Sequence, residues 1–155
     1  WHKLDMKPHQ RSDMLVRVVE GRIWVRYPGM LNPEDERVQI ASRRGIEMAL
    51  QKEAMSYLPR RLRELSRQTG IAFNRVQIKR MKSRWGSCSA RNNINLNMYL
   101  IQLPDDLIDY VLLHELAHVR VKNHQREFWA LLDGLTVAKA RVLDKQLKQY
   151  TVQTP

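Results

Sequence analysis

The chain has 155 residues, of which 43% are hydrophobic and 28% charged. This length fits one domain that can bury a hydrophobic core without the help of disulfide bonds. Its single cysteine, Cys88, excludes an intramolecular disulfide and is typical of a reducing compartment. No apolar run approaches the roughly 20 residues that cross a bilayer and no signal-peptide pattern opens the chain, so we expect a soluble, cytoplasmic protein with no membrane partner.

The formal net charge of +11 is concentrated in one segment. Between residues 60 and 91, ten Lys or Arg side chains are opposed only by Glu64. A field of this sign attracts polyanions, so segment 60–91 is a candidate site for nucleic acid or for nucleotide phosphates. The alternative is a solvated basic surface.

The N-terminal residues predict a tail followed by a hairpin. Residues 1–13 are polar and without pattern, and we interpret them as a tail that precedes a domain over 14–150, with residues 151–155 as a C-terminal tail. Residues 16–27 predict two short strands joined by a turn at Glu20-Gly21. A β-hairpin is therefore expected to open the fold.

A long helical pattern follows. Asn32 as the cap, Pro33 at the first helical position and three acidic residues after it predict a helix start. Apolar residues recur at helical spacing as far as Leu58, and Pro59 is expected to kink or divide the element. A second run over 60–68 is expected to stop at Gly70.

Beyond Gly70 the hydrophobic period changes to two. Residues 75–79 and 93–99 alternate between apolar and polar side chains, which predicts two antiparallel strands of one sheet. The loop expected between them, residues 82–91, combines basic, hydroxyl and aromatic groups. In it, Trp85 is a candidate pocket wall and Arg84 a candidate anion contact, while a loop pinned by buried Trp85 and Cys88 is the alternative.

One predicted helix contains the first residues of the candidate metal site. Leu103-Pro104-Asp105-Asp106 predicts its start, and residues 106–119 are apolar on nearly every face. On such a helix His114 and His118 project from one side with Glu115 beside them. This spacing predicts a Zn²⁺ ion held by the two imidazoles, and Glu115 as the base that takes a proton from the zinc-bound water.

The segment after this helix supplies the third ligand. The helix is expected to end near Lys122-Asn123, which bends His124 back over the metal. Five residues between His118 and His124 is also the metzincin spacing, but Val121 stands where metzincins have glycine and no methionine follows Met98. Glu127 lies too near to be a gluzincin ligand, so we favour His124. The next helix places Phe128 and Trp129 inward, as packing that fixes His124.

These motifs resemble those of a known family. Arg84-Trp-Gly-Ser-Cys88, Ile94-Asn-Leu-Asn97, the His114 to His118 motif and Asn123-His124 with Phe128-Trp129 resemble the YgjP-like metallopeptidases over roughly residues 15–150. More distantly, the chain is similar to the SprT and WLM types of DNA-protein crosslink protease. The resemblance implies a compact, single-domain, zincin-like α+β fold, three histidine ligands and Glu115 as base. It also implies a peptidase, although hydrolysis of nucleoside triphosphates has been attributed to the family.

Three functions therefore remain open: a zinc-dependent peptidase, a nucleoside triphosphate hydrolase using the same site, and a nucleic-acid-binding module whose metal is structural or vestigial, with Cys88 as a candidate fourth ligand. An extended substrate is expected to pair with strand 94–98 if it is the sheet edge. Tyr99, Arg84 and Tyr110 are candidates to stabilise the oxyanion. The residues expected to line the pocket or touch substrate are Arg84, Trp85, Cys88, Asn95, Asn97 and Tyr99.

Overall fold

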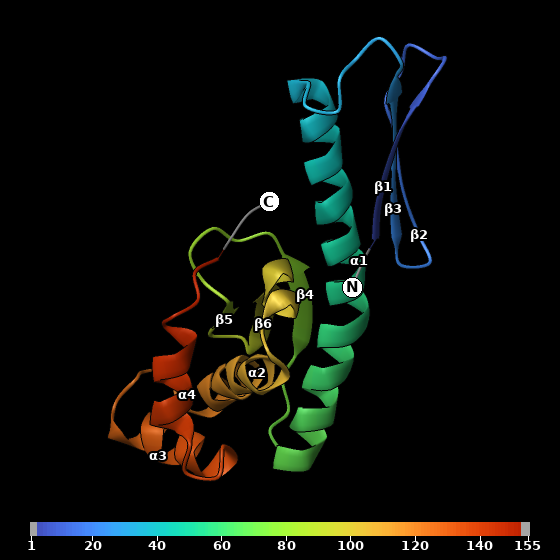
Figure 1. Cartoon of the computed structure of the whole chain (residues 1–155). Helices are drawn as coiled ribbons and strands as arrows, with labels where there is room; N and C mark the ends of the chain where they lie inside the picture. The colour runs from blue at the N-terminus through green and yellow to red at the C-terminus, as the bar shows by residue number, and fades with distance from the viewer. Residues whose placement is uncertain (1–2, 153–155) are drawn as a thin grey trace. The chain divides into compact units, whose positions relative to one another are not determined.

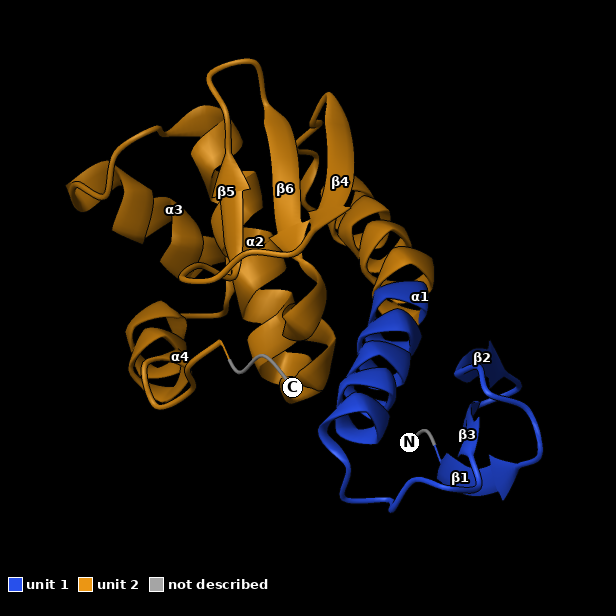
Figure 2. Cartoon of the chain, turned by 90° about the horizontal axis from the view of Figure 1, so that it is seen from above, with its two compact units in different colours: residues 1–52, 155 blue, residues 53–154 orange. Residues whose placement is uncertain are grey.

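The computed structural model describes residues 3–152 and has an α+β fold, as predicted (Figure 1). The chain divides into two compact units, one reaching from the N-terminal side to Lys52 and the other beginning at Glu53 (Figure 2). The long helix α1 (Glu36–Thr69) contributes its first half to unit 1 and its second half to unit 2. Residues 1–2 and 153–155, the outer parts of the two predicted tails, lie outside the described residues.

Unit 1 contains a three-stranded sheet in the order β1-β3-β2. Strands β2 (Leu15–Val19) and β3 (Arg22–Pro28) form the predicted hairpin, with Glu20 and Gly21 at φ 47° and 72° in the turn. Residues 3–9, predicted to belong to a tail, instead form strand β1 (Lys3–His9), which pairs in parallel with β3. Because this pairing uses backbone groups, the polar side chains of β1 give little sign of it.

Helix α1 begins close to the predicted start. The Asn32 side chain accepts a hydrogen bond from the Glu34 amide at 3.0 Å, and the helix starts at Glu36. Pro59 does not divide the helix, and Gly70, at φ 66°, follows its last residue as predicted. Within unit 1, a Cβ on Gly45 would lie 2.5 Å from Ile23 Cγ2, so glycine permits close packing of α1 on β3.

Unit 2 contains the second sheet, in the order β4-β6-β5. Strands β4 (Arg75–Lys79) and β6 (Asn93–Asn97) are adjacent, but they run parallel, so the predicted antiparallel pairing was wrong. The segment predicted as a loop contains the short strand β5 (Gly86–Cys88), antiparallel to β6. Strand β6 is therefore central, and the possibility that it forms the sheet edge is also wrong.

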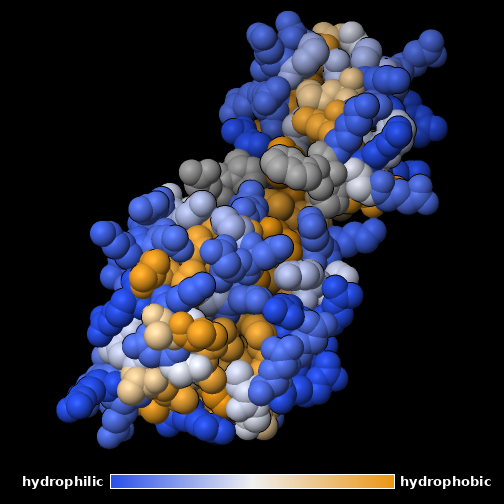
Figure 3. Space-filling view, turned by 60° about the horizontal axis from the view of Figure 1, so that its bottom comes forward, coloured by the Kyte–Doolittle hydropathy of each residue, from blue (hydrophilic) through white to orange (hydrophobic). Residues whose placement is uncertain are grey.

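The helices of unit 2 complete the fold. A 3-10 helix, η1 (Met98–Gln102), leads into α2 (Asp105–Arg120), which is followed by α3 (Arg126–Leu135) and α4 (Ala140–Leu147). Helix α2 is buried along most of its length, as its apolar sequence predicted. Among the described residues, no helix is long and apolar enough to cross a membrane. Figure 3 shows hydrophobic groups lying among hydrophilic ones on the face it presents.

Candidate metal centre

Three imidazoles meet at one point in unit 2. The Nε2 atoms of His114 and His118 are 3.2 Å apart, and that of His124 lies 3.1 Å from the first and 2.9 Å from the second. His114 and His118 come from one face of α2, and His124 comes from the segment between α2 and α3. The sequence prediction that these three side chains converge is therefore confirmed.

These three short contacts cannot all be hydrogen bonds. The Nε2 atom of a neutral imidazole is either a donor or an acceptor, so among three atoms in mutual contact at least two have the same role. Nδ1 of His118 lies 2.9 Å from the Val121 carbonyl oxygen, which can only accept, so Nδ1 carries the proton and Nε2 presents a lone pair. A cation bound by all three lone pairs removes the conflict.

The spacing fits a tetrahedral ion. Bonds of about 2.0–2.1 Å from a metal to imidazole nitrogens at tetrahedral angles place those nitrogens about 3.4 Å apart, slightly beyond the separations found here. Burial, followed by the neighbouring imidazoles, lowers the pKa of His114 to about 4, so this ring is neutral and able to act as a ligand at physiological pH. Within residues 3–152 the cluster consists of these three histidines, which could hold a metal ion.

Phe128 packs against the three imidazole rings, and Trp129 binds the backbone of His124. The Phe128 ring is fully buried, and its centroid lies 4.9, 4.4 and 4.8 Å from the rings of His114, His118 and His124. The Trp129 indole N–H donates to the His124 carbonyl at 3.1 Å, and the Arg141 guanidinium lies 3.5 Å from the Trp129 ring centroid. The predicted role of these aromatics agrees with this packing, although Trp129 is only half-buried.

A lysine ties the His124 segment to the sheet. The Lys122 ammonium donates to the Ser89 carbonyl at 3.0 Å and to the Asn92 side-chain oxygen at 2.5 Å. It also lies 3.7 Å from Cys88 Sγ. Since Ser89 and Asn92 belong to the turn between β5 and β6, this contact fixes the chain two residues before a candidate ligand.

Glu115 lies beside the cluster in a setting suited to a reactive carboxylate. It is 5% exposed, and its Oε2 atom is buried without a hydrogen-bond partner in the described structure. Burial raises the pKa of this carboxyl group to about 8, against a smaller lowering by the charge of Arg84. A Cβ on Gly86 would lie 2.6 Å from Glu115 Oε1, so strand β5 approaches the carboxylate closely because residue 86 is glycine.

A cavity of ≈ 180 Å³ adjoins Glu115 and His114. Trp85, Val111 and Leu147 give it apolar walls, and Tyr110 and Asp144 are polar groups in its lining. The Tyr110 hydroxyl donates to Asp144 Oδ1 at 3.4 Å, and burial raises the pKa of this hydroxyl above its ordinary range. The cavity therefore has a proton donor beside one of the three imidazoles.

The structure separates the predicted pocket residues into two groups. Trp85 lines the cavity, and the exposed Arg84 is close enough to Glu115 for its charge to act on the carboxylate. Cys88 lies outside the histidine cluster, next to Lys122, and burial raises the pKa of its thiol.

The other three predicted residues lie within the fold and not in the cavity. Asn97 is fully buried and donates to the carbonyls of Met81 and Arg84, both at 2.8 Å. Asn95 donates to the Ser87 hydroxyl at 3.3 Å, and Tyr99 is fully buried. None of the three is part of the cavity lining beside Glu115.

Sequence reasoning did not identify Gly86, Asp144 or the tether made by Lys122. Gly86 lies in a segment predicted as a loop, where glycine is common, and only the presence of strand β5 makes this glycine a mark of close backbone approach. The contacts of Asp144 and Lys122 join segments 34 and 30 residues apart, so no local pattern reveals them.

A buried helix with His-Glu-x-x-His and a third histidine beyond its end is the arrangement typical of HExxH-type metallopeptidases. The chain belongs to the YgjP-like family, whose metallopeptidase domain matches residues 8–150. The resemblance inferred from the sequence motifs is thereby confirmed.

Two solved structures share the fold. The metallopeptidase zymogen abylysin of Pyrococcus abyssi is 21% identical, with a TM-score of 0.52, over 59% of this chain and 93% of that protein. The metallopeptidase zymogen jannalysin of Methanocaldococcus jannaschii is 25% identical, with a TM-score of 0.51, over 59% of this chain and 94% of that one. No curated protein matches the sequence.

Proposed function

We propose that this chain is a zinc-dependent peptidase in which His114, His118 and His124 hold the metal and Glu115 is the general base. The observation that carries the proposal is the meeting of three Nε2 atoms within 3.2 Å of one another beside a buried carboxylate whose Oε2 has no partner among the described residues. Bound zinc would lower the pKa of a water and polarise a carbonyl group.

The chain's own residues supply the remaining steps. In its ionised form, which the positive charge of a bound metal ion would favour, Glu115 takes the proton of the attacking water and passes it to the leaving amine. Strand β5 is one of the two edge strands of its sheet and contacts Glu115 through Gly86, so it is suited to pair with an extended substrate. Tyr110, in the wall of the adjoining cavity, is the best placed of the oxyanion candidates.

The test is the variant Glu115→Gln, which keeps the shape of the side chain and removes its basicity. We expect one zinc per chain in both proteins, and a fall of about 10²–10⁴-fold in the cleavage of unfolded casein by the variant. Metal content measured by mass spectrometry separates loss of the base from loss of the site. An unchanged cleavage rate would exclude the assigned role of Glu115.

One observation favours a second function, hydrolysis of nucleoside triphosphates at the same site. Arg84 is exposed and acts electrostatically on Glu115, and a guanidinium there would neutralise phosphate charge. Phosphate release from a panel of nucleotides, measured beside casein cleavage, distinguishes the two reactions. Arg84→Glu should slow phosphate release far more than casein cleavage, because the guanidinium would neutralise phosphate charge directly and acts on the peptidase only through Glu115.

A further inference from the structure

The part of the chain that builds the sheet of unit 2 contains no carboxylate side chain. From Leu65 to Pro104 there is no Asp or Glu, whereas this stretch has seven basic residues: Arg67, Arg75, Lys79, Arg80, Lys82, Arg84 and Arg91. On the neighbouring helices, by contrast, basic and acidic side chains form ion pairs: Arg61 binds both Glu64 at 3.0 Å and Asp109 at 2.7 Å. Within residues 65–104 themselves, therefore, no carboxylate side chain is present to offset this positive charge.

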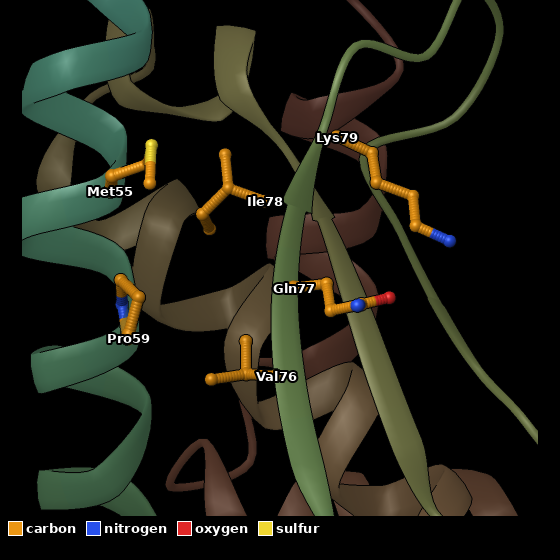
Figure 4. Close-up of a pocket in the computed structure, with 6 residues that line it drawn as sticks. All are labelled: Met55, Pro59, Val76, Gln77, Ile78 and Lys79. Atoms are coloured by element: carbon orange, nitrogen blue, oxygen red, sulfur yellow. The ribbon is translucent and has the colours of Figure 1, made fainter.

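The two faces of this sheet have different surroundings. On one face, Val76 and Ile78 point toward Met55 and Pro59 of α1, around a pocket of ≈ 360 Å³ (Figure 4). The register aligns Gly86 with Leu96 and Leu96 with Ile78, so Gly86 lies on the same face, where its Cβ position points at Glu115 of α2. Side chains alternate along a strand, and Gln77 and Lys79 point away from α1 in Figure 4.

The opposite face is polar across all three strands. The register places Arg75 beside Asn93, and it places Gln77 beside Asn95, which in turn lies beside Ser87. We call this set the polar sheet face: Arg75, Gln77, Lys79, Ser87, Asn93 and Asn95. Its three β4 side chains are exposed, and the other three are partly exposed.

More positive charge lies at both ends of this face. At one end, Asn97 holds the segment 81–84 through two carbonyl groups, and the exposed Lys82 is part of that segment. At the other end, Arg91 is exposed in the turn between β5 and β6. None of Arg75, Lys79, Lys82 and Arg91 forms an ion pair with a carboxylate of residues 3–152.

We propose that the polar sheet face binds nucleic acid through its phosphate backbone. Cations there would displace counterions, and the amide and hydroxyl groups between them can donate hydrogen bonds to phosphate oxygens. The polar sheet face has no aromatic side chain on which a base could stack, so binding there does not depend on the base sequence of the nucleic acid. An acidic protein fits less well, because protein interfaces have an apolar centre that this face lacks.

The test measures binding of the full chain to a fluorescently labelled 30-nucleotide single strand of mixed sequence and to the corresponding duplex, over a range of salt concentrations. We expect log K to fall linearly with log salt for both. The double variant Arg75→Glu/Lys79→Glu should weaken binding at least tenfold. It should also reduce the magnitude of the slope of log K against log salt by roughly 1.4–1.8, the change expected when two phosphate contacts are lost.

The matched control is Lys139→Glu/Lys145→Glu, which makes the same change in net charge at two exposed lysines at or within α4. It should leave the salt slope unchanged, and circular dichroism melting should show that both variants fold. Equal loss of affinity in both variants would overturn the proposal, since binding would then follow net charge alone. Absence of binding at low salt, or equal displacement by polyglutamate, would overturn it as well.

Discussion

At the scale of single residues, the site depends on how closely side chains approach one another. The i, i+4 spacing on a helix was sufficient to predict that His114 and His118 share a face, and the end of that helix was sufficient to place His124. The spacing could not show that Gly86 lies against Glu115, because this contact joins a strand to a helix 29 positions later.

The variant Gly86→Ala tests this contact. Its Cβ would lie 2.6 Å from Glu115 Oε1 and 2.8 Å from Glu115 Cγ, so either the carboxylate or the strand must move. We expect the zinc content to be retained, casein cleavage to fall at least tenfold, and the free energy of unfolding to fall by about 1–3 kcal/mol.

The comparison variant is Gly134→Ala. Gly134 lies near the end of α3 with open space around its Cβ position. This substitution should leave cleavage unchanged and stabilise the helix by up to about 1 kcal/mol. Equal activity of the two alanine variants would show that Glu115 tolerates displacement.

At the scale of elements, the sequence predicted which segments are helices better than how the strands pair. Helix α2 was evident because its apolar residues and acidic first turn act within one segment. The direction of β4 relative to β6 was not evident, because the alternation of apolar and polar side chains identifies a buried face whether two strands run parallel or antiparallel. Strand β5 has three residues, all partly exposed, which is too short for a period to appear.

The element that carries His124 has a tether that can be tested separately. Lys122→Met keeps the aliphatic chain and removes the bonds from the ammonium to Ser89 and Asn92. Because outer-shell partners orient ligands, we expect zinc affinity to fall about 10–100-fold. Competition with a chromophoric chelator measures this dissociation constant.

Two further variants define the outcome at Lys122. Lys122→Arg retains the charge and should recover part of the affinity, whereas Lys145→Met removes a lysine elsewhere and should have no effect. If Lys122→Met binds zinc as the unchanged protein does, the hydrogen bonds to Ser89 and Asn92 do not position His124.

At the scale of the whole molecule, every residue of the candidate site belongs to unit 2. The three histidines join α2 to the segment before α3, and Phe128 of α3 packs under all three rings. A metal ion would therefore add a cross-link within unit 2, and β1, β2 and β3 of unit 1 provide an internal reference.

Removal of metal should accordingly destabilise one part of the chain. A ligand that binds only the folded state at 100 times its dissociation constant stabilises by about 2.7 kcal/mol, which corresponds to a melting temperature shift on the order of 10 °C. We expect zinc added to the chelated protein to produce a shift of this size, and hydrogen exchange to slow in α2 and α3 while β1, β2 and β3 are unchanged. The variant His124→Ala should show neither effect, because two imidazoles leave the tetrahedral set incomplete. A similar shift in that variant would mean that zinc stabilises the protein from another location, and the three-histidine centre would no longer explain it.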